Sequence, residues 1–161
     1  MAKGLEDLEV LSEAQVISDE LWNRVLKWER LARDVVGEQL VRAADSVGAN
    51  IAEAFGRYHY ADKIRFLYYA RGSVFETRYW IGRARARQLM SDTDFAHLDG
   101  QLAVVAQKLN AFVRSLRAQS RQDKDGASRV VRELGGHPYA VTNPIQLHHL
   151  ILDEDGLISN P

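Results

Sequence analysis

Two glutamates, Glu53 and Glu76, are the residues of this sequence whose pairing would allow the most chemistry. Two carboxylates brought together inside a helical bundle can carry out acid–base catalysis or hold two metal ions. Metal sites of that kind also use Glu-x-x-His pairs, and the sequence contains none. Arg57 lies one helical turn after Glu53 and Asn50 one turn before it, so charge compensation is the more economical interpretation. We therefore predict a structural role for both glutamates and no catalytic residue.

Polar residues around Glu53 share one side of a predicted helix. These residues follow one another at intervals of seven, four, three and four, and they form a stripe next to the apolar arc of the same helix: Gln39, Ser46, Asn50, Glu53 and Arg57. An ordinary solvated face mixes charges freely, whereas this stripe lines uncharged hydrogen-bonding groups beside one acid and one base. We predict a buried structural network that also includes the second glutamate, with these members: Gln39, Ser46, Asn50, Glu53, Arg57 and Glu76.

A second cluster combines guanidinium groups with aromatic rings on the next predicted helix. One bundle buries only one face of a helix, and this cluster lies apart from the face that would enter the core. It therefore requires a partner. Three arginines at seven-residue intervals lie beside an apolar strip: Arg71, Arg78 and Arg85 beside Ile64, Tyr68, Phe75 and Tyr79.

Two kinds of partner suit this cluster. Guanidinium groups that meet phosphates and aromatic rings that stack on bases are the usual combination for single-stranded nucleic acid. Arginine and aromatic side chains are equally typical of subunit interfaces. Residues 57–87 carry eight basic and two acidic side chains, whereas residues 1–38 carry five basic and nine acidic ones. These complementary charges favour a homo-oligomer interface over RNA or DNA binding, and both interpretations stay open at this stage.

The histidines and the remaining motifs indicate no metal site, no cofactor and no small-molecule substrate. His148 and His149 are adjacent, so they point in different directions even though Asp153, Glu154 and Asp155 follow them. This acidic run lacks the spacing of a calcium loop. The chain has no cysteine, and no phosphate-binding loop, nucleophile elbow or zinc signature is present. We expect a protein that is not an enzyme.

Apolar periodicity predicts four helices, at about 13–31, 35–57, 61–90 and 95–118. Ser12 and Gln15 have the spacing of a capping box for the first helix, and Asp34 stands where the second needs an N-cap. Short links between such helices predict an all-α, antiparallel up-down-up-down four-helix bundle over residues 1–119. Residues 120–161 are polar and interrupted by glycine and proline. We predict that they form an irregular, flexible tail whose segment 145–152, IQLHHLIL, docks on the bundle or on a neighbour.

The two central helices resemble those of a known family. Residues 39–57, QLVRAADSVGANIAEAFGR, fit the pattern Q-x-x-R-A-A-x-S-x-x-A-N-I-A-E-x-x-G-R, and residues 66–76, FLYYARGSVFE, fit F-L-x-x-A-x-G-S-x-x-E. Both patterns are typical of the four-helix bundle proteins encoded in intervening sequences of bacterial 23S ribosomal RNA genes. The N-terminal LEDLEV is similar to the family's opening F-E-D-L-x-V, with Leu5 in place of Phe. The resemblance extends from Leu5 to Leu116.

This resemblance implies an up-down-up-down bundle that assembles into a ring of five, with no established enzymatic activity. A more distant relative, the accessory protein of diversity-generating retroelements, works with a reverse transcriptase and nucleic acid, but its motifs are not visible in this sequence. No apolar run is long enough to span a membrane, and the start, MAKGLEDLEV, lacks a signal-peptide core. We expect a cytoplasmic, non-enzymatic, pentameric scaffold or adaptor. The alternative is an RNA- or DNA-binding accessory protein.

Overall fold

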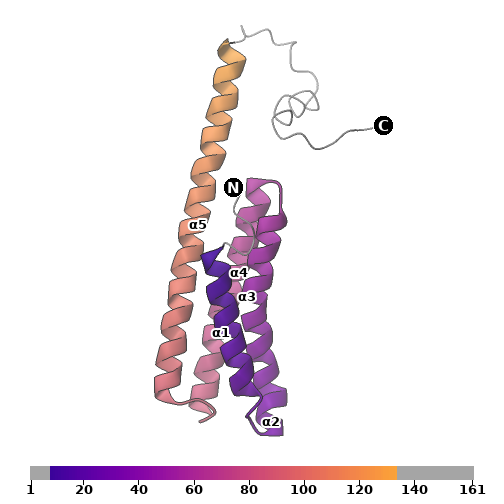
Figure 1. Cartoon of the computed structure of the whole chain (residues 1–161), viewed down its shortest axis with the longest axis vertical. Coiled ribbons are helices and arrows are strands. Elements are labelled where there is room, and N and C mark those ends of the chain that lie inside the picture. The colour runs from indigo at the N-terminus through magenta and orange to yellow at the C-terminus, as the bar shows by residue number, and fades with distance from the viewer. Residues whose placement is uncertain (1–7, 134–161) are drawn as a thin grey trace, which may run out of the picture. The chain divides into compact units, whose positions relative to one another are not determined.

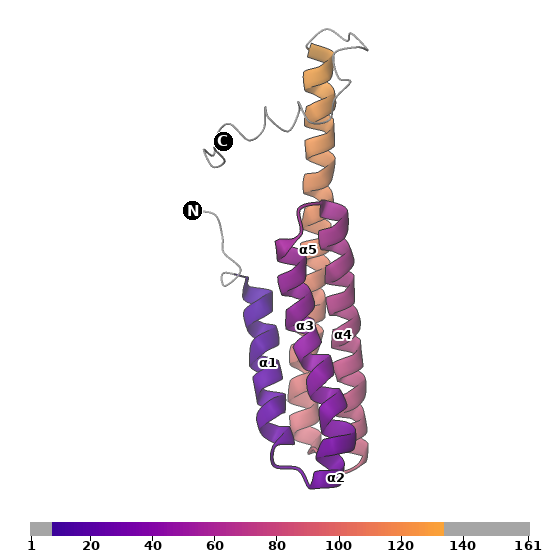
Figure 2. The same ribbon diagram turned by 90° about the vertical axis from the view of Figure 1, so that its right-hand side faces the viewer.

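The computed structural model describes the backbone of residues 8–133 and the side chains of residues 8–125. Every regular element in this range is helical, which confirms the all-α prediction. The elements in chain order are α1 (Glu9–Val25), α2 (Arg30–Ala32), the π-helical turn η2 (Arg33–Gly37), α3 (Glu38–Gly56), α4 (Tyr60–Ala86) and α5 (Asp92–Glu133). Both views show α1, α3, α4 and α5 lying lengthwise beside one another (Figures 1 and 2).

The first helix differs from its prediction at both ends. It begins at Glu9 after the N-cap residue Leu8, which makes no side-chain capping bond, and it ends at Val25. The predicted capping box at Ser12 is wrong, because that residue already lies inside the helix. The apolar face explains the earlier start, since residues 10, 11 and 14 are all buried and add one more turn to the packed stripe.

The second long helix also starts earlier than residue 35. Helical backbone is continuous from Arg30 to Gly56 through α2, η2 and α3. The predicted N-cap at Asp34 is wrong, because this residue lies within the π turn. Gly37, at the end of that turn, packs so closely on α1 that a Cβ there would overlap Val25 Cγ1. The glycine therefore permits a close approach of the two helices.

The last two helices also differ from their predicted bounds. The predicted helix at 61–90 is α4, which ends at Ala86 before a turn in which Gln88 has a φ of 60°. α5 starts at Asp92 with Ser91 as its cap, since the Ser91 hydroxyl accepts a bond from the Asp94 amide at 3.0 Å. α5 continues to Glu133, so the boundary predicted at residue 120 falls inside a helix. The chain divides into compact units at 1–121 and 122–161, and the described part of the second unit, residues 122–133, is helical.

The core of the first unit draws large side chains from each of the four long helices. Complete burial of a leucine or isoleucine stabilises the fold by about 1.5–3 kcal/mol, so this cluster fixes which face of each helix is available to partners. None of the helices in the described range is both long and apolar enough to cross a membrane. The largest fully buried aliphatic side chains are Leu21, Leu40, Ile51, Leu67, Ile81, Leu98, Leu102 and Leu109.

Polar contacts show how α5 lies against its neighbours. Near the start of α5, Asp94 pairs with Arg24 at the end of α1, and further along, Lys108 pairs with Glu13 near the start of α1. The contacts of α5 with α4 also run in opposite order along the two helices. Asp92 at the start of α5 pairs with Arg85 near the end of α4, and Asp99, further along α5, pairs with Arg78, which comes earlier in α4. α5 therefore packs between α1 and α4, and each of these pairs runs in opposite directions.

Candidate functional site

The outer face of α4 carries a row of aromatic side chains that the single chain leaves uncovered. Tyr68, Phe75 and Tyr79 are 42%, 48% and 60% exposed, whereas Ile64 is partly buried against the core. These four residues are called the α4 strip below. The opposite face of α4 is filled by buried residues such as Leu67 and Ile81, so the helix cannot turn the strip inward without losing its core contacts.

Guanidinium groups lie over the rings of the α4 strip. The Arg71 carbon Cζ is 5.1 Å from the centre of the Phe75 ring, and Arg78 lies 5.9 Å from the same ring. Arg117 of α5 lies 5.9 Å from the Tyr68 ring and donates a hydrogen bond of 2.8 Å to its hydroxyl. Cation–π contacts of this kind hold the rings in place on the surface.

Two of the three arginines predicted to meet a partner are neutralised inside the chain. Arg78 makes a two-pronged pair with Asp99 of α5, with distances of 2.6 and 2.9 Å. The hydrogen bond from Arg78 lowers the pKa of the Asp99 carboxyl, although partial burial of that carboxyl opposes the shift. Arg85 pairs with Asp92 at 2.5 Å. These partners could not be predicted from the sequence, because the register between α4 and α5 is set only by tertiary packing.

Arg71 differs from the other two arginines. It is half-buried, and its Nε is enclosed without a hydrogen-bond partner among the described residues. Its stacking on Phe75 is the contact that fixes its position. Arg71 is therefore the arginine of the cluster with hydrogen-bonding capacity left for another molecule.

The predicted buried network around Glu53 is wrong for the single chain. Glu53 and Arg57 form an ion pair in which both side chains are exposed, and Glu76 is exposed on a different helix. Ser46 donates to the Arg42 carbonyl at 2.8 Å, and Asn50 donates to the Ser46 carbonyl at 2.8 Å. Gln39 likewise accepts from Arg42. The stripe satisfies itself along one helix, because neighbours three or four residues away supply its partners without any need for burial.

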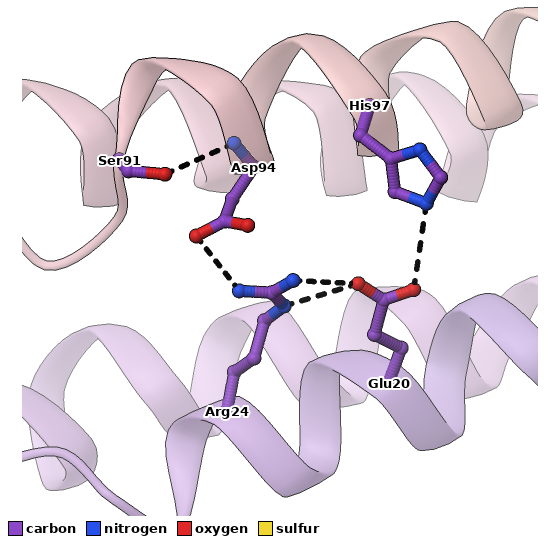
Figure 3. Close-up of polar contacts among 5 residues, drawn as sticks. All are labelled: Glu20, Arg24, Ser91, Asp94 and His97. Atoms are coloured by element: carbon purple, nitrogen blue, oxygen red, sulfur yellow. Dashed lines mark hydrogen bonds and ion pairs between the residues drawn. The ribbon is translucent and has the colours of Figure 1, made fainter.

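A polar seam between α1 and α5 was missed by the sequence analysis. Figure 3 shows Arg24 between Glu20 at 2.8 Å and Asp94 at 2.9 Å, with His97 on the far side of the glutamate. The hydrogen bond to Glu20 is the largest of the effects that raise the pKa of Arg24. Glu20 and Arg24 meet within α1, whereas Asp94 and His97 reach them only because α5 packs against α1.

The same seam continues towards the start of α1. Lys108 of α5 pairs with Glu13 and, at 2.6 Å, with Glu9. These two carboxylates, Glu13 first, raise the pKa of Lys108. Beside this pair lies a groove bounded by α1 and α5, whose lining is Ser12, Glu13, Val16, Ile17, Gln101 and Val104.

The remaining predicted sites lie elsewhere. Residues 145–152, which include His148 and His149, fall outside the described residues. Within the described range, no three or more histidine, aspartate and glutamate side chains gather as metal ligands would. The α4 strip and its arginines therefore stand as the surface with the clearest capacity to bind another molecule.

These features define an all-α bundle with an uncovered aromatic face. The family model described as 23S rRNA-intervening sequence protein matches residues 6–111, and the chain belongs to this family. A solved structure of a protein with unknown function, from the S23 ribosomal protein family of Bacteroides thetaiotaomicron VPI-5482, is similar with a TM-score of 0.59 and 20% identity. The likeness spans 65% of this chain and 97% of the other, and at this identity it shows the fold alone. No curated protein sequence matches the chain.

Proposed function

We propose that the protein is a non-enzymatic, self-assembling bundle that serves as a cytoplasmic scaffold or adaptor, with the α4 strip as its subunit interface. The observation that carries this proposal is the exposure of Tyr68, Phe75 and Tyr79 on one side of a helix whose other side is already committed to the core. Aromatic residues clustered with arginine are typical of the centres of interfaces. Covering them removes apolar surface from water.

We infer a ring of five copies, the assembly implied by the resemblance of the two central helices. A closed ring needs two different surfaces on each copy, one for each neighbour, because a self-complementary patch alone gives only dimers. The α4 strip would supply one of the two. Light scattering of the full chain over a range of dilutions tests this, with five times the mass of one chain as the expected result. A protein that stays a single chain at every concentration would contradict it.

A matched pair of variants locates the interface. Phe75→Arg replaces a ring that is 48% exposed with a charged side chain, so the bundle should fold while the assembly falls to single chains. Leu31→Arg changes a residue that is 77% exposed on α2, away from the strip, and should keep the wild-type mass. Circular dichroism checks that both variants stay helical. Loss of assembly in both variants, or in neither, would argue against the α4 strip.

RNA binding is a second candidate with an observation of its own. α4 carries six basic and two acidic residues, and Arg83 and Arg87 at its end are exposed without an ion pair in the described part of the chain. The description of the family, which names an intervening sequence of 23S rRNA, points the same way. The neutralisation of Arg78 and Arg85 by α5 makes this the weaker proposal.

The salt dependence of binding separates the two candidates. An RNA that contacts several arginines releases counterions, so its affinity should fall by about 10³-fold or more between 50 and 200 mM salt. A structured RNA titrated at those two concentrations measures this directly. The same titration with Arg83→Gln/Arg87→Gln should show a shallower dependence if these arginines meet phosphates. An unmeasurable affinity at the lower concentration would remove this candidate.

A further inference from the structure

The groove between α1 and α5 has the character of an unfilled docking site. Its volume is about 230 Å³, and its walls include Val16 and Val104, which are 58% and 44% exposed. An apolar cavity of ~150 Å³ accepts a benzene ring, so this groove has room for one aromatic side chain. Nothing in the described part of the single chain fills it.

Two hydrogen-bond acceptors in this groove have no donor. Glu13 Oε2 and Gln101 Oε1 are both enclosed and unpaired, although the other oxygen of Glu13 accepts from Lys108. Enclosed polar atoms are normally satisfied, so these two residues of the groove wall keep acceptor capacity that no donor of the described chain uses. A guanidinium group beside an aromatic ring fits both the acceptors and the apolar walls.

Arg71 and Phe75 on the outer face of α4 provide that combination. Among the described residues, the third enclosed and unpaired side-chain atom is Arg71 Nε, which is a donor. Phe75 lies one turn further along α4, with its ring 5.1 Å from the Arg71 guanidinium. The exposed Phe75 ring and the guanidinium stacked on it therefore form one unit on the outer face of α4.

We propose that the Arg71–Phe75 unit of one copy docks into the α1–α5 groove of the next copy. This inference rests on the proposed self-assembly and names the second surface that such an assembly needs. Phe75 fills the space between Val16 and Val104, and Arg71 donates to Glu13 and Gln101.

The net charges of the two helices agree with this pairing, although several of the residues counted also pair within the chain. α1 carries four acidic residues and one basic residue, and α4 carries six basic and two acidic ones. Because ring and groove occupy different surfaces of the same chain, the contact is head-to-tail. Such contacts can close into a ring.

The groove between α1 and α3 suits this unit less well. It is also apolar, with Trp22 and Leu26 at its edge. Two of its three carboxylates are already engaged, since Asp34 pairs with Arg30 and Arg33, and Asp45 accepts from Ser18. The third, Glu38, is exposed to solvent. It offers no enclosed acceptor that lacks a donor within the described chain.

Two blocking variants of the full chain test the inference. Val16→Arg fills the groove with a cation, and Phe75→Arg removes the ring; each should reduce the assembly to single chains while helical content stays unchanged. Val35→Arg is the matched control, because Val35 is 53% exposed on η2, outside the groove, and this variant should keep the wild-type mass.

Mixing the two blocked variants gives the deciding result. Each retains the surface that the other lacks, so an equimolar mixture should form a one-to-one dimer and stop there, as measured by native mass spectrometry. If Val16→Arg keeps the wild-type mass while Phe75→Arg loses it, the groove is not the partner surface and the proposed self-assembly stands. A mixture without dimers also overturns the inference. A wild-type chain that never assembles overturns both proposals.

Discussion

Gly37 occupies a position where a single methyl group would alter the packing of two helices. A Cβ there would overlap Val25 Cγ1, and a β-branched side chain has little freedom to move aside. We expect Gly37→Ala to lower the free energy of unfolding by about 1–3 kcal/mol, the usual cost of overpacking. Urea denaturation measures the change.

Gly100 provides the control for that substitution. It lies inside α5, and a Cβ there would meet no atom within 4 Å. Gly100→Ala should therefore raise the free energy of unfolding by about 1 kcal/mol through helix propensity alone. Equal effects of the two substitutions on the free energy of unfolding would show that an added methyl group at Gly37 does not disturb the packing of η2 on α1.

Gln88 carries backbone strain that glycine would relieve. Its φ of 60° lies in the left-handed region, which costs a residue with a side chain about 1–2 kcal/mol. We expect Gln88→Gly to raise the free energy of unfolding by about 1 kcal/mol. Gln107→Gly, at an exposed site within α5, should lower it by a similar amount. A loss of stability in both variants would show that the glutamine side chain has an unrecognised structural role.

For single residues, the sequence predicts which apolar side chains are exposed better than it predicts the partners of charged side chains. The exposure of Tyr68, Phe75 and Tyr79 follows from helical periodicity, because the buried arc of α4 leaves no room for them. The partners of Arg78 and Arg85 do not follow from it. Asp99 and Asp92 reach them only because α5 turns back along α4, and a shift of one helical turn would have selected other residues.

Among the helices, the contact of α4 with α5 should make stability depend on pH. The pKa of Asp99 is lowered in the folded chain by the hydrogen bond from Arg78. Because this pKa is lower in the folded chain, the pair stabilises the fold fully at pH values above about 3.9, the pKa of an unfolded aspartate. This stabilisation is lost as the pH falls through the pKa of the folded state. We expect Asp99→Asn to weaken the decline in stability below about pH 5.

A double-mutant cycle isolates this pair. Arg78→Gln should weaken the acid-dependent decline in the same way, and the double variant should differ little from either single variant. Urea midpoints from neutral to acidic pH provide the measurement. Additive effects of the two substitutions would show that the residues act independently despite their contact.

The helix ends were harder to predict than the helices themselves. α1 begins at Glu9 because buried Val10 and Leu11 extend its apolar face, and this packing outweighs the capping signal at Ser12. The end of α5 was missed for the opposite reason. Beyond Arg121 the sequence has little apolar periodicity, yet its arginine, glutamine, lysine and alanine residues favour helix on intrinsic propensity.

For the whole molecule, the described core is contained within the first compact unit. All the buried hydrophobic residues that the structure describes lie between Val10 and Leu116, and the unit ends at Arg121. A chain that ends at Arg121 should therefore unfold in one cooperative transition, with a midpoint within about 2 °C of the full chain. Thermal circular dichroism tests this at several concentrations. A midpoint lowered by much more would show that residues 122–161 support the bundle.

The π turn at Arg33–Gly37 has a consequence for how the chain can change in length. A π turn holds one residue more than an α turn needs, so it stores an insertion without interrupting the helix. Loss of one residue there would restore regular winding, while α2 before the turn and α3 after it keep the faces that they present to the bundle. We therefore expect single-residue gains and losses among related chains to gather at this point, where the bundle accommodates them most cheaply.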